Sequence, residues 1–97
     1  MNQSRIIRGL VLALAAAPAF AQTTPPSGRL LASNCFQCHG TNGKGGVETL
    51  AGKSASEIVK ELKEMQGKAT PKMMDMHARG YTDAEIALIA NYFAAQR

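Results

Sequence analysis

Apolar side chains recur with helical spacing in three segments of the chain beyond residue 26. Each segment opens on a residue that can cap a helix, namely Ser27, Ser54 or Thr82, and the last two begin Ser/Thr-x-x-Glu capping boxes. The periodic positions are Gly28, Leu31, Ala32 and Cys35, then Ile58, Leu62 and Met65, then Ile86, Ile89, Ala90 and Phe93. We expect a short first helix, a second from Ser54 to about Gln66, and a third from Thr82 to about the C-terminus. Because no segment alternates with period two, the pattern predicts an all-α fold.

Two stretches between these helices carry signals for irregular backbone. Five glycines between positions 40 and 52 favour a loop that can pass close to something flat. Thr70-Pro71 opens a second irregular segment, which carries Met73, Met74 and Met76. Loops this long in a small domain typically either wrap a ligand or have no ordered structure.

The N-terminal segment has the features of a secretory signal peptide. Arg5 and Arg8 precede an apolar run over 9–17, and Ala19 and Ala21 occupy the small-residue positions before a cleavage site. An uncleaved short membrane anchor is the alternative, although the run is shorter than a bilayer requires. The sequence thus divides into three expected parts: a signal peptide (1–21), a flexible leader (22–26) and one exported domain (27–97).

Composition limits the function classes further. A chain of 97 residues allows a single domain, and its net charge of +4 is too small and too scattered for a nucleic-acid surface. No tract is long enough for a permanent membrane span, so the mature protein is expected to be soluble. With no Trp, two Tyr and three Phe, the chain has few bulky side chains for a core. A bulky apolar cofactor would make up that shortage.

Both cysteines of the chain stand in the motif Cys35-Phe36-Gln37-Cys38-His39, the Cys-x-x-Cys-His signature of c-type haem attachment. Two thiols at this spacing on a helix end can each form a thioether with one porphyrin, while the adjacent imidazole reaches the iron. One alternative is a thioredoxin-like disulfide, which would follow a strand in a βαβ unit and need more chain. Another is a zinc site with the ligands Cys35, Cys38, His39 and His77, in which the adjacent Cys38 and His39 would be awkward tetrahedral partners.

The segment before the last helix supplies candidates for a second axial ligand of the iron. They are Met73, Met74, Met76 and His77. Methionines also serve as soft core filler around an apolar surface, which is the alternative here. A Met/His pair would raise the reduction potential and leave no vacant coordination site, which favours electron transfer over oxygen or peroxide chemistry. Four lysines in the loops around the cofactor either form a docking rim or are simply solvated: Lys44, Lys53, Lys68 and Lys72.

From Gly28 to Gln96 the chain resembles the small class I c-type cytochromes. The matching segments are 31–40, 74–86 and 90–93. The resemblance implies a small all-α fold in which three main helices and their loops wrap around one covalent haem c. It also implies that the first and last helices cross, with Gly28 or Ala32 receiving Tyr92 or Phe93.

The same resemblance assigns the attachments of the cofactor. Cys35 and Cys38 would carry the thioethers, and His39 would bind the iron. The family's Met-x-x-x-Ala segment selects Met74 as the second iron ligand, with Met73 next. Members of the family often have a proline after the haem histidine, and its carbonyl orients the imidazole. No proline stands between positions 46 and 50, so the acceptor for the His39 ring N–H stays open.

Residues 78–82 are most similar to the haem subunit of flavocytochrome c sulfide dehydrogenases. This likeness implies a periplasmic monohaem cytochrome that carries single electrons between protein partners, among them a flavoprotein subunit with FAD that oxidises sulfide. Such a protein would not itself make or break substrate bonds. Two alternatives stay open: a free-standing soluble electron carrier of a respiratory chain, and a haem enzyme that acts directly on a sulfur compound.

Overall fold

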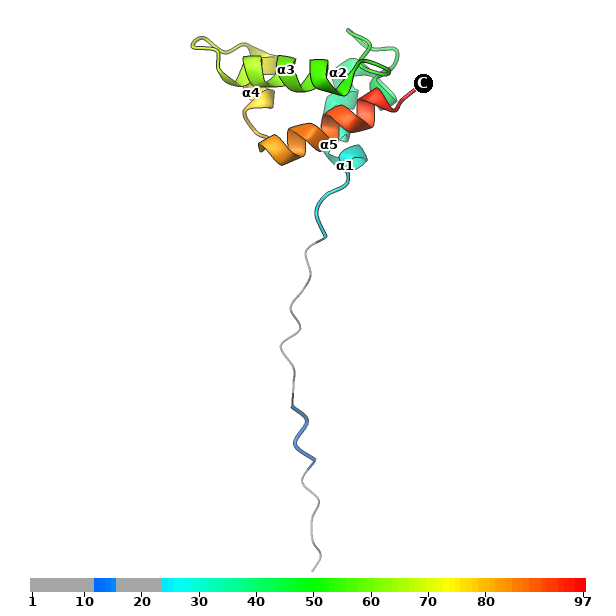
Figure 1. Ribbon diagram of the computed structural model, residues 1–97, viewed down its shortest axis with the longest axis vertical. Helices are drawn as coiled ribbons and strands as arrows, with labels where there is room; N and C mark the ends of the chain where they lie inside the picture. The colour runs from blue at the N-terminus through cyan, green and yellow to red at the C-terminus, as the bar shows by residue number, and fades with distance from the viewer. Residues whose placement is uncertain (1–11, 16–23) are drawn as a thin grey trace, which may run out of the picture.

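The computed structural model describes residues 12–15 and 24–97 (Figure 1). The predicted signal peptide and the start of the predicted leader lie outside the described residues, apart from 12–15. Residues 24–26 of the leader have no regular secondary structure and are exposed. Within the described ranges, no helix has both the length and the apolar character needed to cross a bilayer.

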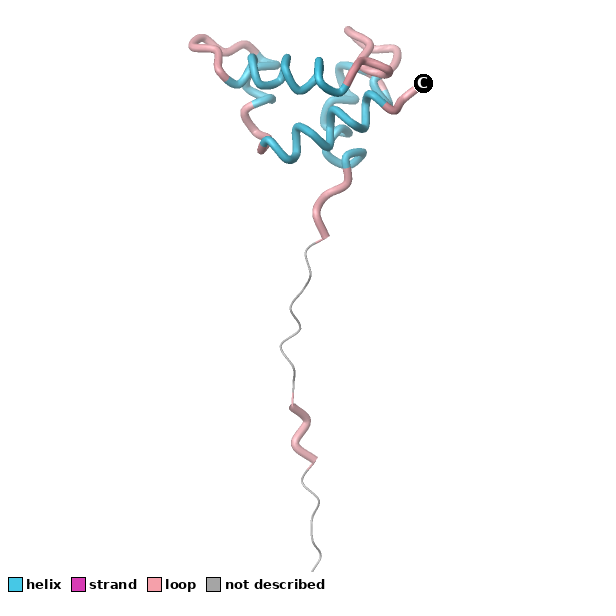
Figure 2. Tube along the Cα trace, in the orientation of Figure 1, coloured by secondary structure: helices cyan, strands magenta, loops and turns pink. Residues whose placement is uncertain are grey.

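The described part of the chain is built from helices joined by loops, and it contains no strand (Figure 2). The all-α prediction is therefore confirmed. In chain order the elements are α1 (Gly28–Ala32), the 3-10 turn η1 (Ser33–Cys35), α2 (Phe36–His39), the 3-10 turn η2 (Thr41–Gly43), α3 (Ala55–Gln66), α4 (Met73–Ala78) and α5 (Asp83–Ala94). The three predicted helices correspond to α1 with its continuation through η1 and α2, to α3, and to α5.

The starts of these three helices follow from their capping residues. The hydroxyl of Ser27 accepts the Leu30 N–H at 3.1 Å, and the hydroxyl of Ser54 accepts the Glu57 N–H at 3.1 Å. Thr82 forms a complete capping box, because its hydroxyl accepts the Glu85 N–H at 3.2 Å and the Glu85 carboxylate accepts the Thr82 N–H at 3.0 Å.

The core lies where α1 and α3 pack against α5, and α1 lies beside α5 in Figure 1. Gly28 permits the close crossing of the first and last helices. A Cβ atom at this position would lie 2.6 Å from the Leu88 carbonyl oxygen and 3.3 Å from the Tyr92 Cβ. The expected contact between Gly28 and Tyr92 is thus present. The buried core residues are Leu31, Ala32, Ile58, Ile89, Ala90 and Phe93.

The segment expected to be irregular after Pro71 contains a helix instead, so that part of the prediction is wrong. Residues Met73–Ala78 form α4, and the methionines stand on this short helix rather than on a loop. A carboxylate provides the cap, since Asp75 accepts the Lys72 N–H at 2.8 Å. The chain between α3 and α4 is irregular as expected.

Candidate cofactor site

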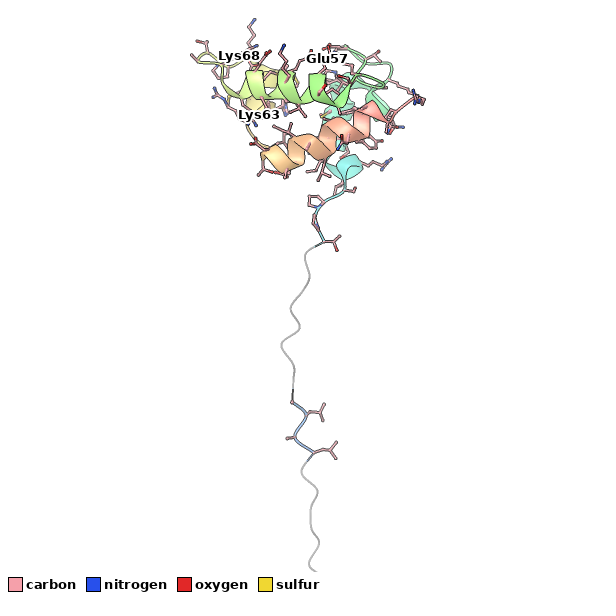
Figure 3. The ribbon with its side chains drawn as sticks, in the orientation of Figure 1. Glu57, Lys63 and Lys68 are labelled. Carbon is pink, nitrogen blue, oxygen red and sulfur yellow. The ribbon has the colours of Figure 1, made fainter. Side chains whose placement is uncertain are left out.

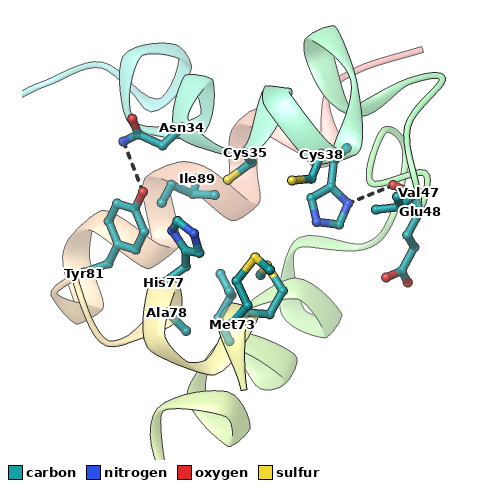
Figure 4. Close-up of a pocket in the computed structure, with 13 residues that line it drawn as sticks. Asn34, Cys35, Cys38, Val47, Glu48, Met73, His77, Ala78, Tyr81 and Ile89 are labelled. Carbon is teal, nitrogen blue, oxygen red and sulfur yellow. Dashed lines mark hydrogen bonds between the residues drawn. The ribbon is translucent and has the colours of Figure 1, made fainter. Parts of the chain in front are cut away.

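A cavity of about 450 Å³ opens between the cysteine segment, α4 and α5 (Figure 4). It has the size of a small-molecule pocket, and its inner wall includes Leu62 from α3 and Ile89 from α5. A smaller cavity of about 70 Å³ lies against it and shares Cys35, His39 and Met74 with it. Four sequence-predicted residues therefore line the same cavity: Cys35, Cys38, His39 and Met74.

Both cysteine side chains face this cavity as free thiols (Figure 4). Cys35 closes η1 and is half-buried, whereas Cys38 lies on α2 and is exposed. Burial raises the pKa of the Cys35 thiol. The short turns of this segment bring the two sulfur atoms to the same side of the chain. This arrangement suits attachment of one group at two points, and the cysteines are not joined in a disulfide.

His39 is buried, and a backbone carbonyl fixes the role of each ring nitrogen. Its Nδ1 atom lies 3.0 Å from the carbonyl oxygen of Glu48. Because a carbonyl only accepts, Nδ1 carries the proton and donates it, which leaves the lone pair of Nε2 for a metal. The acceptor that the missing proline left open is thus the carbonyl of Glu48.

Glycine brings this carbonyl to the histidine. The backbone of Gly46 runs so close to the cysteine segment that a Cβ atom there would lie 2.2 Å from the His39 carbonyl carbon and 2.3 Å from the Cys38 carbonyl oxygen. The Val47 N–H then donates to the Cys38 carbonyl at 2.8 Å. This bond places the carbonyl of Glu48 beside the ring.

The side chain of Glu48 forms an ion pair with Lys53, at the far end of the same loop. Its carboxylate accepts a hydrogen bond from the Lys53 ammonium at 2.7 Å, and this bond lowers the pKa of Glu48. Lys53 also lies 3.9 Å from the Glu61 carboxylate on α3. The loop that orients His39 is therefore held by backbone and side-chain contacts together.

On the opposite side of the cavity, α4 presents the candidate axial ligands. Met74 is half-buried and lines both cavities, whereas Met73 is 73% exposed and lines only the larger one. His77 is exposed and also lines the larger cavity. Met76 lines neither and belongs to an outer surface hollow. The structure thus brings Met73, Met74 and His77 together and sets Met76 apart.

Two of the four lysines proposed for a docking rim are engaged in ion pairs within the protein. Lys53 is engaged by Glu48, and Lys68 lies 3.4 Å from the buried Asp75 carboxylate. Figure 3 places Lys68 in the loop beyond α3. None of the four lysines lines the cavity. Solvation and local ion pairs account for Lys53 and Lys68 without a protein partner.

Two side chains, Asn34 and Gln66, form hydrogen bonds near α4 that the sequence did not indicate. The Asn34 amide donates to the Tyr81 hydroxyl at 3.1 Å, joining η1 to the chain just before α5 (Figure 4). Gln66, the last residue of α3, donates to the carbonyl of Ala78, the last residue of α4, and to that of Tyr81. Both contacts join residues far apart in the sequence, so no local spacing signals them.

The residues around the cavity fit a covalently attached haem. Two thiols face one space, a buried imidazole has Nε2 available, and a thioether lies half-buried on the opposite helix. The zinc alternative lacks such a fit, because residues 12–15 and 24–97 contain no group of three or more His, Cys, Asp or Glu side chains arranged to hold a metal ion.

The chain is similar to known proteins over most of its length. The chain matches the protein family described as "Cytochrome C oxidase, cbb3-type, subunit III" over residues 15–93, a range that contains both the cysteine motif and α4. It is also similar to the "Cytochrome subunit of sulfide dehydrogenase" of Chlorobaculum tepidum, with 40% identity over 82 residues. That alignment covers 81% of this chain and 74% of the relative.

Proposed function

The chain belongs to this family of c-type cytochrome domains, which bind haem c and transfer electrons, and on that premise we propose how it holds its haem and where it works. One haem is attached through Cys35 and Cys38, and its iron is bound by His39 and Met74. The observation that carries this assignment is the single cavity lined by all four side chains, with the Nδ1 atom of His39 already engaged by a carbonyl.

Haem supplies one-electron chemistry when it is bound, and the residues of the chain determine how that chemistry is used. The Glu48 carbonyl fixes the tautomer and orientation of His39, which raises the basicity of the imidazole as a ligand. Met74, which lines the cavity together with His39, would be the second protein ligand of the iron, and a His/Met pair would leave no coordination site for a small substrate. Leu62, Ala78 and Ile89 provide apolar walls for the cavity. These properties support electron transfer rather than bond-making chemistry.

The protein works in the periplasm and accepts electrons from a flavoprotein that oxidises sulfide. The relative from Chlorobaculum tepidum supports this partner, because it is described as the cytochrome subunit of a sulfide dehydrogenase. The location is supported by the signal-peptide pattern of residues 1–21. Redox proteins that meet in this way exchange single electrons through transient or stable contacts.

The test is to purify the native protein from its own cells without a tag and to examine what accompanies it. The expected result is a red protein with one haem added to its mass, an N-terminus near residue 22, and a flavin-containing subunit that reduces it when sulfide is added. A lone red monomer that no flavoprotein reduces would favour a free-standing respiratory carrier. A haem that binds a sulfur compound directly would favour the enzyme alternative, and a colourless protein would refute the assignment as a whole.

A further inference from the structure

Two side chains, Gln66 and Arg79, join the end of α3 to the end of α4. The Nε2 atom of Gln66 donates to the carbonyl oxygen of Ala78 at 2.8 Å and to that of Tyr81 at 3.0 Å. The first of these carbonyls is the last one of α4, and the second lies in the turn that leads to α5. Because the terminal carbonyls of a helix have no partner within it, Gln66 satisfies a group that α4 cannot satisfy itself.

Arg79 makes the reciprocal contacts. Its Nε atom donates to the carbonyl oxygen of Gln66 at 3.3 Å, and its Nη2 atom donates to that of Lys68 at 2.5 Å. The Gln66 side chain thus bonds to the backbone at and after the end of α4, and the Arg79 side chain bonds to the backbone at and after the end of α3. We call these four hydrogen bonds of Gln66 and Arg79 the α3–α4 clamp.

The α4 helix depends on such external contacts for its position. It has six residues, and only Asp75 and Ala78 among them are buried. A helix this short is not stable by itself, because nucleation costs more than so few internal hydrogen bonds return. At its start, Asp75 accepts the Lys72 N–H and lies 3.4 Å from the Lys68 ammonium, but both contacts tie α4 only to the loop that precedes it and not to a neighbouring helix. At its end, the clamp connects α4 to a neighbouring helix.

We propose that Gln66, assisted by Arg79, is the positioning residue that keeps the Met74 sulfur on the distal side of the haem cavity. This inference rests on the proposed function, in which Met74 binds the iron. Thioether sulfur is a soft ligand and holds ferric iron less firmly than ferrous iron. In the oxidised protein, retention of Met74 therefore depends most on the structure that carries it. Without the clamp, α4 moves away more often and leaves the axial position open to external ligands.

The experiment measures the affinity of the oxidised holoprotein for imidazole, which binds only when Met74 has left the iron. Gln66→Met preserves the length of the side chain and removes its donors. The expected result is about tenfold tighter apparent imidazole binding, a factor that corresponds to ~1.4 kcal/mol. The long-wavelength charge-transfer absorption of the Met–ferric bond weakens in parallel. Arg79→Met shifts both readings in the same direction by a smaller factor, and it covers the case in which Gln66→Met fails to fold.

The matched control is Gln96→Met. The Gln96 amide also donates to a backbone carbonyl, that of Tyr92 at 2.9 Å, but at the far end of α5 and away from the cavity lining. This variant should leave imidazole affinity and the charge-transfer absorption unchanged, even where its melting temperature falls. Equal imidazole affinity in the wild type, Gln66→Met and Arg79→Met overturns the clamp while leaving Met74 as the ligand. A wild-type protein that lacks the Met–ferric absorption overturns Met74 ligation and the clamp together.

Discussion

Replacing Gly46 by Ala tests the structure that orients His39. A Cβ atom at position 46 would lie 2.2 Å from the His39 carbonyl carbon, 2.3 Å from the Cys38 carbonyl oxygen and 2.5 Å from the His39 Cα. All three atoms belong to the backbone, so no side chain can rotate to make room. The loop must move outward, and two hydrogen bonds weaken with it: Val47 N–H to Cys38 and His39 Nδ1 to Glu48.

The loss of stability expected for Gly46→Ala follows from these contacts. Overpacking of this kind destabilises by about 1–3 kcal/mol, and each of the two hydrogen bonds contributes roughly 0.5–1.5 kcal/mol. We therefore expect Gly46→Ala to lower the free energy of unfolding of the holoprotein by roughly 2–6 kcal/mol. The measurement is guanidinium unfolding, combined with hydrogen exchange of the Val47 amide, whose protection should fall sharply.

Gly45 supplies the control beside it. It adopts φ +79° with open space around its Cα, so Gly45→Ala adds backbone strain but no contact. That strain costs about 1–2 kcal/mol, and the protection of the Val47 amide should be kept. If Gly46→Ala proves no more destabilising than Gly45→Ala, or if both leave the Val47 amide equally protected, the close approach does not hold the histidine's partner in place.

Two further substitutions address the axial ligand and the Glu48 ion pair. Met74→Ala should lower the reduction potential and abolish the Met–ferric absorption, while Met73→Ala, matched in size and position, should preserve both; the reverse result would assign the iron to Met73. Lys53→Met should cost less than about 1 kcal/mol near neutral pH, because the Glu48 carboxylate is exposed and the pair lies at the surface. The Lys53 bond lowers the pKa of Glu48, so its contribution is present above the carboxylate's ordinary pKa and disappears as the pH falls through the lowered one. Unfolding measured against pH should therefore show the two proteins converging in acid, and a gap that persists there would contradict the assignment.

The helices that begin with a side-chain cap were predictable, and α4 was not. The starts of α3 and α5 can be recognised from Ser54 and Thr82, because each of these hydroxyl residues precedes apolar residues at helical spacing. That spacing also indicates which face of the helix is buried. The α4 helix has no such start, since Lys72 stands at its N-cap and Pro71 precedes it. Its cap comes from Asp75, a residue inside the helix. Six residues are also too few for helical periodicity to be recognised.

Some residues of the candidate site were likewise predictable from the sequence and others were not. The Cys-x-x-Cys-His motif located the thiols and the imidazole, because their chemistry depends on residue type and spacing. Glu48 was not predicted, since it acts on His39 through a carbonyl that every residue possesses. Once α4 is known to be helical, the separation of Met76 from Met74 follows, because positions two apart point to different faces of a helix.

The pairing of α1 with α5 has a consequence for how the protein matures. The buried cluster joins Leu31 and Ala32 at one end of the domain to Ile89, Ala90 and Phe93 at the other. Since these surfaces bury one another, a polypeptide emerging N-terminus first has no core until its last helix has arrived. During that interval the segment that carries both thiols has no core to pack against, whereas in the folded domain both thiols line the cavity and Cys38 stays exposed.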